Sequence, residues 1–322
     1  MIQKLKSVRE RIEPCSPPVW AMGGHLQTIL GHLVPSEVDE SDGETHLIGL
    51  ESESEKLHAT LYRGESKTLV SVFHGLGSDT ETDYIRRTSL LAQKLGHNVL
   101  LVNHRGCGKG KGLAKESYHS GRAEDLSAAI AYGRKLFPEY THVAVGFSLS
   151  ANALLLLAAK YRGEVQPDVA IAVNGPIHLD HCSLRLKTGL NRIYDYRFLL
   201  QLKSYIRENR PEMKKGLKAR TLREFDEYYT APSGGFKDHL HYYETCSALP
   251  HLKNISIPTV MLSALDDPFV VGADYEKAEI SPLVHLHLEK HGGHMGYLSK
   301  QGFGFYRWMD HAIESYLKAI HD

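Results

Sequence analysis

The most informative stretch of this sequence is His142-Val-Ala-Val-Gly-Phe-Ser-Leu-Ser-Ala-Asn152. Its apolar, β-branched beginning predicts a buried strand, and the residues from Leu149 onward predict a helix. Between them, residues 146–150 match Gly-x-Ser-x-small, the tight turn that exposes a nucleophilic serine between a strand and a helix. Ser150 departs from the usual glycine but is small. Such a short pattern often arises by chance, so its position after a strand and before a helix is what makes Ser148 the candidate nucleophile.

The same alternation of strand and helix runs through most of the chain. Short apolar runs predict strands over 68–73, 98–102, 142–145, 168–173, 259–263 and 283–288, and helical spacing predicts helices over 83–95, 122–137, 149–161 and about 306–320. Apolar strands separated by helices are typical of a parallel sheet covered on both faces. The sequence therefore predicts an α/β fold with a mostly parallel central sheet.

Two segments fall outside this alternation. Residues 176–250 are more charged, rich in tyrosine and helical in spacing, and a connection of this length should carry its own structure. We interpret them as a helical lid inserted into a catalytic domain formed by residues 46–175 and 251–322. Residues 1–45 are expected to be a mostly irregular N-terminal arm.

A serine hydroxyl needs a base and an acid, which in this arrangement follow it in the order acid, then histidine. Two adjacent carboxylates, Asp266 and Asp267, follow the predicted strand 259–263. We favour Asp267, 119 residues after Ser148, because it directly precedes Pro268 and pre-proline residues prefer extended backbone. Asp266 remains the alternative at this stage.

The base is expected after the last predicted strand. His294 follows Gly292-Gly293, a flexible approach suited to placing an imidazole at the edge of a sheet, and lies 27 residues after Asp267. His291 is the alternative. For the oxyanion, the expected donors are the backbone N–H of Leu149, after the nucleophile, and that of Leu76 in Phe73-His-Gly-Leu-Gly-Ser78.

Taken together, these motifs resemble the α/β-hydrolase superfamily. The N-terminal Trp20-Ala-Met-Gly-Gly-His-Leu-Gln-Thr28 is similar to the YheT-like branch, which includes abhydrolase-domain esterases and lipases. The resemblance covers nearly the whole chain. It implies a Ser–Asp–His hydrolase of carboxylic esters, acting on short-chain acyl esters or monoacylglycerol-like lipids without a cofactor. The other motifs on which this resemblance rests are His74-Gly-Leu-Gly77, Asn103-His-Arg-Gly-Cys-Gly108, Gly146-Phe-Ser-Leu-Ser150, Asp266-Asp-Pro-Phe269, Gly293-His294, Thr221–Tyr229 and Tyr242-Tyr243.

Composition excludes several other classes. The 38 basic and 38 acidic residues cancel, which argues against a nucleic-acid partner. The four cysteines are irregularly spaced, and no signal peptide or spanning segment is visible, so we expect a cytoplasmic protein. The 20 histidines suggest a metal, but the pair His285 and His287 lacks a third ligand at a typical spacing. The sequence thus predicts no metal site.

Three alternatives remain. The same triad would serve a thioesterase or an amidase, because a fold does not determine the leaving group. A non-catalytic ligand-binding protein would reuse the pocket, although it has no need of all three groups. The aromatic and basic residues of the predicted lid allow weak contact with a membrane surface. The sequence predicts no oligomeric state.

Overall fold

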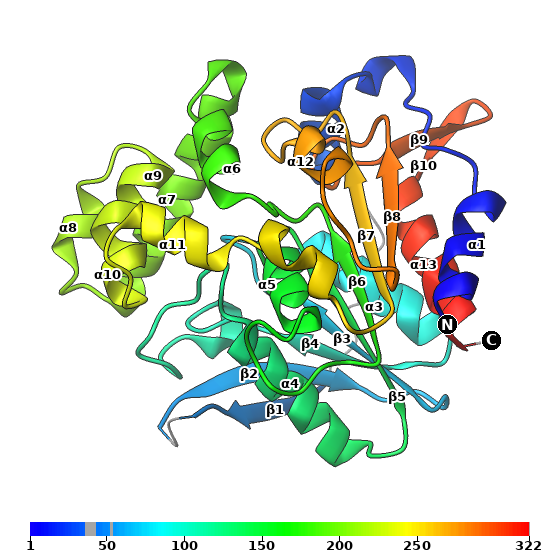
Figure 1. Cartoon of the computed structure of the whole chain (residues 1–322), viewed down its shortest axis with the longest axis horizontal. Coiled ribbons are helices and arrows are strands. Elements are labelled where there is room, and N and C mark those ends of the chain that lie inside the picture. Colours follow the sequence, from blue (N-terminus) through cyan, green and yellow to red (C-terminus); the bar gives the residue numbers. More distant parts are fainter. Residues whose placement is uncertain (36–42, 52–53, 322) are drawn as a thin grey trace.

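The central feature of the computed structural model, which describes residues 1–35, 43–51 and 54–321, is an eight-stranded sheet (Figure 1). Its strand order is β1-β2-β4-β3-β5-β6-β7-β8. The strands are β1 (Glu44–Gly49), β2 (Lys56–Tyr62), β3 (Thr68–Phe73), β4 (Asn98–Val102), β5 (Thr141–Phe147), β6 (Val169–Val173), β7 (Thr259–Ala264) and β8 (Val284–Glu289).

The strands from β4 to β8 pair in parallel, whereas β1 and β2 join one edge antiparallel. All six strands predicted from the sequence are present. Five of them, β3 to β7, are mainly apolar and almost completely buried, whereas β8 lies at the sheet edge and alternates leucine with histidine. The strands β1 and β2 were not anticipated. β1 is mostly exposed and polar, so its apolar pattern is weak, and its pairing with β2 is a tertiary contact.

Helices cover both faces of the sheet (Figure 1). One face packs against α1 (Ile2–Arg11), α3 (Asp83–Lys94) and α13 (Trp308–His321), and the other against α4 (Ala123–Leu136) and α5 (Leu149–Ala158). Every residue of α5 is buried. The predicted α/β architecture with a mostly parallel sheet is confirmed.

The expectation of a mostly irregular N-terminal arm was wrong. Residues 1–35 contain α1, a short 3₁₀ helix at Val19–Ala21 and α2 (Gly24–Leu33). Leu5 and Val8 of α1 are buried against α13 and β8, so tertiary packing stabilises a helix whose strongly charged sequence carries only a thin apolar stripe. The polar stretch 36–42 lies outside the described residues. The closing helix begins at Trp308, because β9 (Leu298–Gln301) and β10 (Gly304–Arg307) form a hairpin just before it.

The inserted segment 176–250, described in full, is helical and contains no strand, as the sequence predicted. It extends beyond one end of the sheet (Figure 1). Its α-helices are α6 (Leu179–Leu186), α7 (Arg192–Asn209), α8 (Lys214–Leu217), α9 (Leu222–Phe225), α10 (Ala231–Ser233) and α11 (His239–Cys246), joined by a 3₁₀ turn at Gly189–Asn191 and a π-helical turn at Asp226–Thr230.

A buried histidine on β8 predicts an acid-sensitive fold. Burial, assisted by His287, Arg9 and Lys6, lowers the pKa of His285 from 6.5 to about 4. As the pH falls below 6.5, His285 becomes protonated in the unfolded chain while it stays neutral in the folded protein. The free energy of unfolding is therefore not reduced by this group above pH 6.5, and it decreases as the pH falls from 6.5 towards 4. At about pH 5.5 the loss from this one group should be about 1 kcal/mol. Measured by urea unfolding across this pH range, the free energy of unfolding of His285→Leu should decrease less steeply with falling pH than that of the parent protein. An equally steep decrease in the variant would contradict this role of His285.

Candidate active site

Ser148 lies on a strained turn between β5 and α5. Its backbone has φ 51° and ψ −116°, a left-handed conformation that a non-glycine residue adopts only when the surrounding structure enforces it. The Ser148 N–H donates to the Val173 carbonyl at 2.8 Å, which ties the turn to β6. A Cβ on Gly146 would lie 2.8 Å from the Ser150 carbonyl oxygen, so the position two residues before the serine requires glycine.

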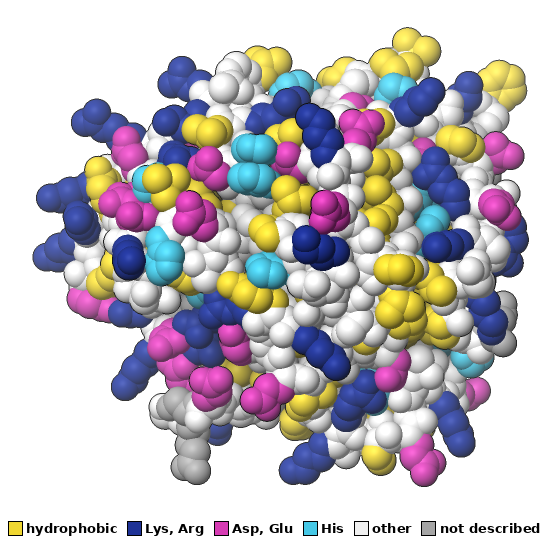
Figure 2. Space-filling model, in the orientation of Figure 1, with side chains coloured by type: hydrophobic (Ala, Val, Ile, Leu, Met, Phe, Trp, Pro, Cys, Tyr) yellow, Lys and Arg dark blue, Asp and Glu magenta, His cyan; other side chains and the backbone are white. Residues whose placement is uncertain are grey.

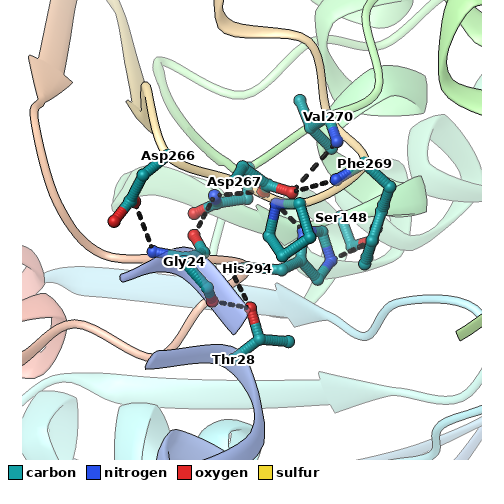
Figure 3. Close-up of polar contacts among 12 residues, drawn as sticks. Gly24, Thr28, Ser148, Asp266, Asp267, Phe269, Val270 and His294 are labelled. Carbon is teal, nitrogen blue, oxygen red and sulfur yellow. Dashed lines mark hydrogen bonds and ion pairs between the residues drawn. The ribbon is translucent and has the colours of Figure 1, made fainter. Parts of the chain in front are cut away.

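Three side chains form a hydrogen-bonded chain at the carboxyl ends of three parallel strands (Figure 3). His294 Nε2 lies 3.0 Å from Ser148 Oγ, and His294 Nδ1 lies 2.8 Å from Asp267 Oδ2. Ser148 follows β5, Asp267 follows β7 and His294 follows β8. The structure thus brings together the three residues that the sequence nominated for this role.

Asp267 is 1% exposed, and both of its carboxylate oxygens are engaged. Oδ1 accepts hydrogen bonds from the backbone N–H groups of Phe269 (3.1 Å) and Val270 (3.0 Å). Oδ2 accepts from Asn174 Nδ2 at 2.9 Å in addition to contacting His294. These bonds offset the cost of burying the carboxylate and hold it in one orientation. Asn174 was not singled out from the sequence, since it follows β6 without a recognisable motif.

The alternative acid and base lie together, apart from the serine. Asp266 Oδ1 accepts a hydrogen bond from the Gly293 N–H at 2.8 Å, and His291 Nδ1 lies 3.5 Å from Asp266 Oδ2. The His291 side chain is 41% exposed. Asp266 therefore contacts the backbone that leads to His294, whereas the imidazole of His294 bonds to Asp267 (Figure 3).

The N-terminal arm supports the histidine loop directly (Figure 3). Thr28 Oγ1, on α2, accepts a hydrogen bond from the His294 N–H at 2.8 Å and donates to the Gly24 carbonyl at 2.7 Å. A Cβ on Gly24 would lie 1.7 Å from the Asp266 carbonyl oxygen, and one on Gly293 would lie 2.4 Å from the Gly24 carbonyl oxygen. Only glycines allow this backbone-to-backbone approach. The motif that contains Thr28 was visible in the sequence, but the role of this hydroxyl was not.

Thr28 should therefore act as a positioning residue for His294. Thr28→Val keeps the shape of the side chain but removes its hydrogen bonds, and we expect turnover of an ester substrate to fall about tenfold, equivalent to about 1.4 kcal/mol. Thr28→Ser, which keeps the hydroxyl, should restore most of the activity. The measurement is kcat and KM for each variant. A fall confined to KM, or an equal fall in the serine variant, would contradict a role through the hydroxyl.

The loop after β3 lies against the serine. A Cβ on Gly75 would lie 3.0 Å from Ser148 Cβ. The loop is held from both sides, because the Gly75 N–H donates to Tyr84 Oη at 2.8 Å and the Gly77 N–H donates to Tyr118 Oη at 2.9 Å. Leu76, between these anchors, lines the same pocket as Ser148 and Leu149.

A buried group of polar side chains supports this loop from below. Ser150 Oγ donates to the His74 carbonyl at 2.5 Å, and His104 Nε2 lies 2.6 Å from Ser150 Oγ. Burial lowers the pKa of His104 to about 4 and the pKa of His74 well below its usual range, so both imidazoles are neutral near pH 7. The hydroxyl of Ser150 thus explains the departure from glycine noted in the sequence, since it binds the loop that faces Ser148.

Two pockets meet at Ser148. The first lies under the inserted helices and is mainly apolar; its lining includes Leu179, Leu186, Phe198, Leu202, Leu222 and Phe225. The second lies between α2 and α7 and is lined by residues of both helices together with Ser148 and His294. Leu76, Ser148, Phe198 and Phe269 line both pockets, so the serine stands at their junction.

Within residues 1–35, 43–51 and 54–321, no group of three or more His, Cys, Asp and Glu side chains could hold a metal ion. His287, considered above as a ligand, instead contacts Tyr316 Oη and Glu289. None of the helices in these same ranges combines the length and the apolar character needed to cross a membrane.

Comparison with known proteins places this arrangement in a family. A sequence profile described as "Alpha/beta hydrolase family" matches residues 70–303. The chain belongs to the α/β-hydrolase family. It falls within the YheT-like branch of these hydrolases: it is 32% identical to "Putative esterase YheT" of Escherichia coli strain K12, over 79% of this chain and 78% of that protein.

Two further similarities extend the comparison. The hydrolase is 26% identical to "Phospholipase ABHD3" of Homo sapiens, over 94% of this chain and 78% of that protein. Among solved structures it resembles the Pyrococcus furiosus esterase Pf2001, with a TM-score of 0.57, 18% identity, and coverage of 88% of this chain and 98% of that one. At this low identity the structural likeness concerns the fold alone.

Proposed function

We propose that this hydrolase cleaves esters of short-chain acids or monoacylglycerol-like lipids, with Ser148 as nucleophile, His294 as base and Asp267 as the acid of the triad. The class is that of the carboxylic ester hydrolases, in agreement with relatives named as an esterase and a phospholipase. The observation that carries the residue roles is the unbroken chain of contacts from Ser148 Oγ to His294 and on to Asp267.

The proposed reaction has two halves. His294 Nε2 accepts the proton of Ser148 as Oγ attacks the ester carbonyl, and then passes that proton to the leaving alcohol. Water, deprotonated by the same imidazole, hydrolyses the acyl-enzyme and releases the acid. Asp267 holds the imidazole in the tautomer with a proton on Nδ1 and stabilises its charged form. These steps use only side chains, backbone groups and water.

The oxyanion is proposed to bind to two backbone N–H groups. That of Leu149 is at the first position of α5 and has no partner within the helix. That of Leu76 is in the loop anchored beside the serine. One such donor is worth about 2.7–4 kcal/mol of transition-state stabilisation.

The two pockets suggest how a substrate is oriented. We assign the acyl chain to the apolar pocket under residues 176–250, which act as the lid, and the alcohol to the pocket between α2 and α7. Burying a methylene group in the first pocket gains about 0.8 kcal/mol, so affinity should rise with acyl length until the pocket is full.

The decisive test is labelling with a fluorophosphonate, followed by mass spectrometry of the peptide that contains Ser148. We expect one adduct, on Ser148. Hydrolysis of a series of p-nitrophenyl esters and monoacylglycerols should then define the acyl length, with acyl-CoA and anilide substrates measured in parallel. Faster turnover of acyl-CoA or anilides would indicate the thioesterase or the amidase, and tight ligand binding without turnover would indicate a binding protein.

A further inference from the structure

The mouth of the pocket between α2 and α7 is surrounded by exposed apolar side chains. On α2 and the turn before it, Met22, Leu26, Ile29 and Leu33 recur at helical spacing on the outer face. A second stripe lies on the outer face of α7 and the turn before it. We call these residues and two phenylalanines of the β9–β10 hairpin the rim: Val19, Trp20, Met22, Leu26, Ile29, Leu33, Leu190, Ile193, Tyr196, Leu200, Phe303 and Phe305.

Contacts between the three elements hold them together around the pocket mouth. Trp20 packs edge-on against Phe305, with ring centroids 5.4 Å apart. The guanidinium of Arg307 donates to two carbonyls at the end of α2, which joins the hairpin to that helix. Across the pocket, Arg197 Nη2 of α7 lies 2.7 Å from His32 Nε2 of α2. Figure 2 shows hydrophobic side chains along the upper edge of the molecule, where Figure 1 places the N-terminal arm and the upper end of the inserted segment.

This exposure is unusual because twelve large apolar side chains gather around one pocket mouth. Single apolar residues are common on protein surfaces, whereas large contiguous patches mark sites of contact with a protein or a membrane. Ile29, Leu33 and Ile193 of the rim also line the pocket that leads to Ser148. Whatever covers the rim therefore lies at the entrance used by the substrate.

The charge of the rim segments indicates which kind of partner would cover the rim. Residues 19–34, 187–203 and 298–307 contain one acidic side chain, Asp195, which is only 5% exposed and accepts a hydrogen bond from the Leu222 N–H. The same segments expose Lys187, Arg192, Arg197 and Lys300. In a chain with equal numbers of acidic and basic residues, these three segments therefore carry an excess of exposed cations, and Asp83 of α3 is an exposed acid in the lining of the same pocket. An anionic phospholipid surface has the complementary chemistry.

We propose that the rim docks this hydrolase on a bilayer that contains anionic phospholipid. Apolar side chains enter the boundary between headgroups and acyl chains, while the cations contact the headgroups. A second copy of the chain docked by the same face would place cations against cations and would close the pocket mouth. A lipid surface instead leaves the mouth facing its substrate. The inference that docking brings the pocket to its substrate rests on the proposed ester hydrolysis. The docking itself requires no chemistry at Ser148.

The test measures binding apart from catalysis. Ser148→Ala protein is sedimented with vesicles of phosphatidylcholine alone and of phosphatidylcholine with phosphatidylglycerol. We expect binding to the anionic vesicles, and a loss of about tenfold or more in Leu26→Glu/Leu190→Glu, two rim positions outside the lining of both pockets. Lys187→Gln/Arg192→Gln should weaken binding about fivefold per charge.

The matched control is Leu47→Glu/Leu240→Glu, which changes two leucines that are 46% and 45% exposed, on β1 and α11. It should bind vesicles like the parent. With Ser148 restored, the two leucine double variants should hydrolyse a water-soluble p-nitrophenyl ester at the parent rate, which verifies their folding.

Equal binding by the rim and control variants, or no sedimentation of the parent with anionic vesicles, would overturn the docking surface. A dimer in sedimentation velocity that only the rim variants abolish would also overturn it, in favour of self-association. Failure of the hydrolase proposal is distinguishable, because it would abolish ester turnover and leave vesicle binding unchanged.

Discussion

Ser148→Ala should lower kcat/KM for any ester substrate by at least about 10⁴-fold, because the acyl-enzyme cannot form without the hydroxyl. The residual rate would come from the oxyanion donors and from substrate binding alone. The change removes one oxygen from a side chain that is 8% exposed, so the fold should be retained.

The measurement is turnover of a p-nitrophenyl ester at matched enzyme concentration, together with a thermal melt of both proteins. The Ser148→Ala protein should also give no adduct with fluorophosphonate. Activity within about tenfold of the parent, which is far less than the loss of a nucleophile causes, would show that another residue attacks the ester.

The second large effect concerns the adjacent aspartates. Asp267→Asn should reduce kcat by about 10³–10⁴-fold, because an amide favours the wrong imidazole tautomer and gives no stabilisation to the charged ring. The amide would also have to replace a carboxylate that accepts two backbone hydrogen bonds through Oδ1.

Asp266→Asn is the matched control, since it makes the same change one residue earlier. Asp266 supports the Gly293 N–H rather than the imidazole of His294, so its amide variant should lose at most about tenfold. Kinetics of the two variants on one ester, with circular dichroism to verify folding, makes the comparison. An equal or larger loss in Asp266→Asn would show that the triad acid has been assigned to the wrong aspartate.

Much of the sheet was predictable from local sequence. β3 to β7 are almost completely buried, so each appears as a short, mainly apolar run between turn residues. The turn around Ser148 was predictable for a related reason, since strain and close packing restrict its flanking residues to small side chains. The helical character of residues 176–250 followed from their spacing.

The N-terminal arm was not predictable in this way. Neither the helices within residues 1–35 nor the role of Thr28 follows from local pattern. The charged α1 depends on α13 for its burial, and the contact between Thr28 and His294 joins residues 266 positions apart in the chain. Asn174 is a similar case, because its contribution is the hydrogen bond that it donates to the Asp267 carboxylate, and that contact forms only in the folded chain.

The sequence by itself determined the class of fold, the nucleophile candidate and the order of the catalytic groups, because these depend on local periodicity and on turns that admit few residue types. The sequence favoured Asp267 and His294, but only the tertiary structure shows that the His294 imidazole contacts both Ser148 and Asp267, whereas His291 lies beside Asp266, since neighbouring side chains of one type can point in different directions. The tertiary structure also assembled the rim from three distant segments. Hydrogen bonds, and surfaces assembled from distant segments, depend on positions in space, which sequence spacing does not specify.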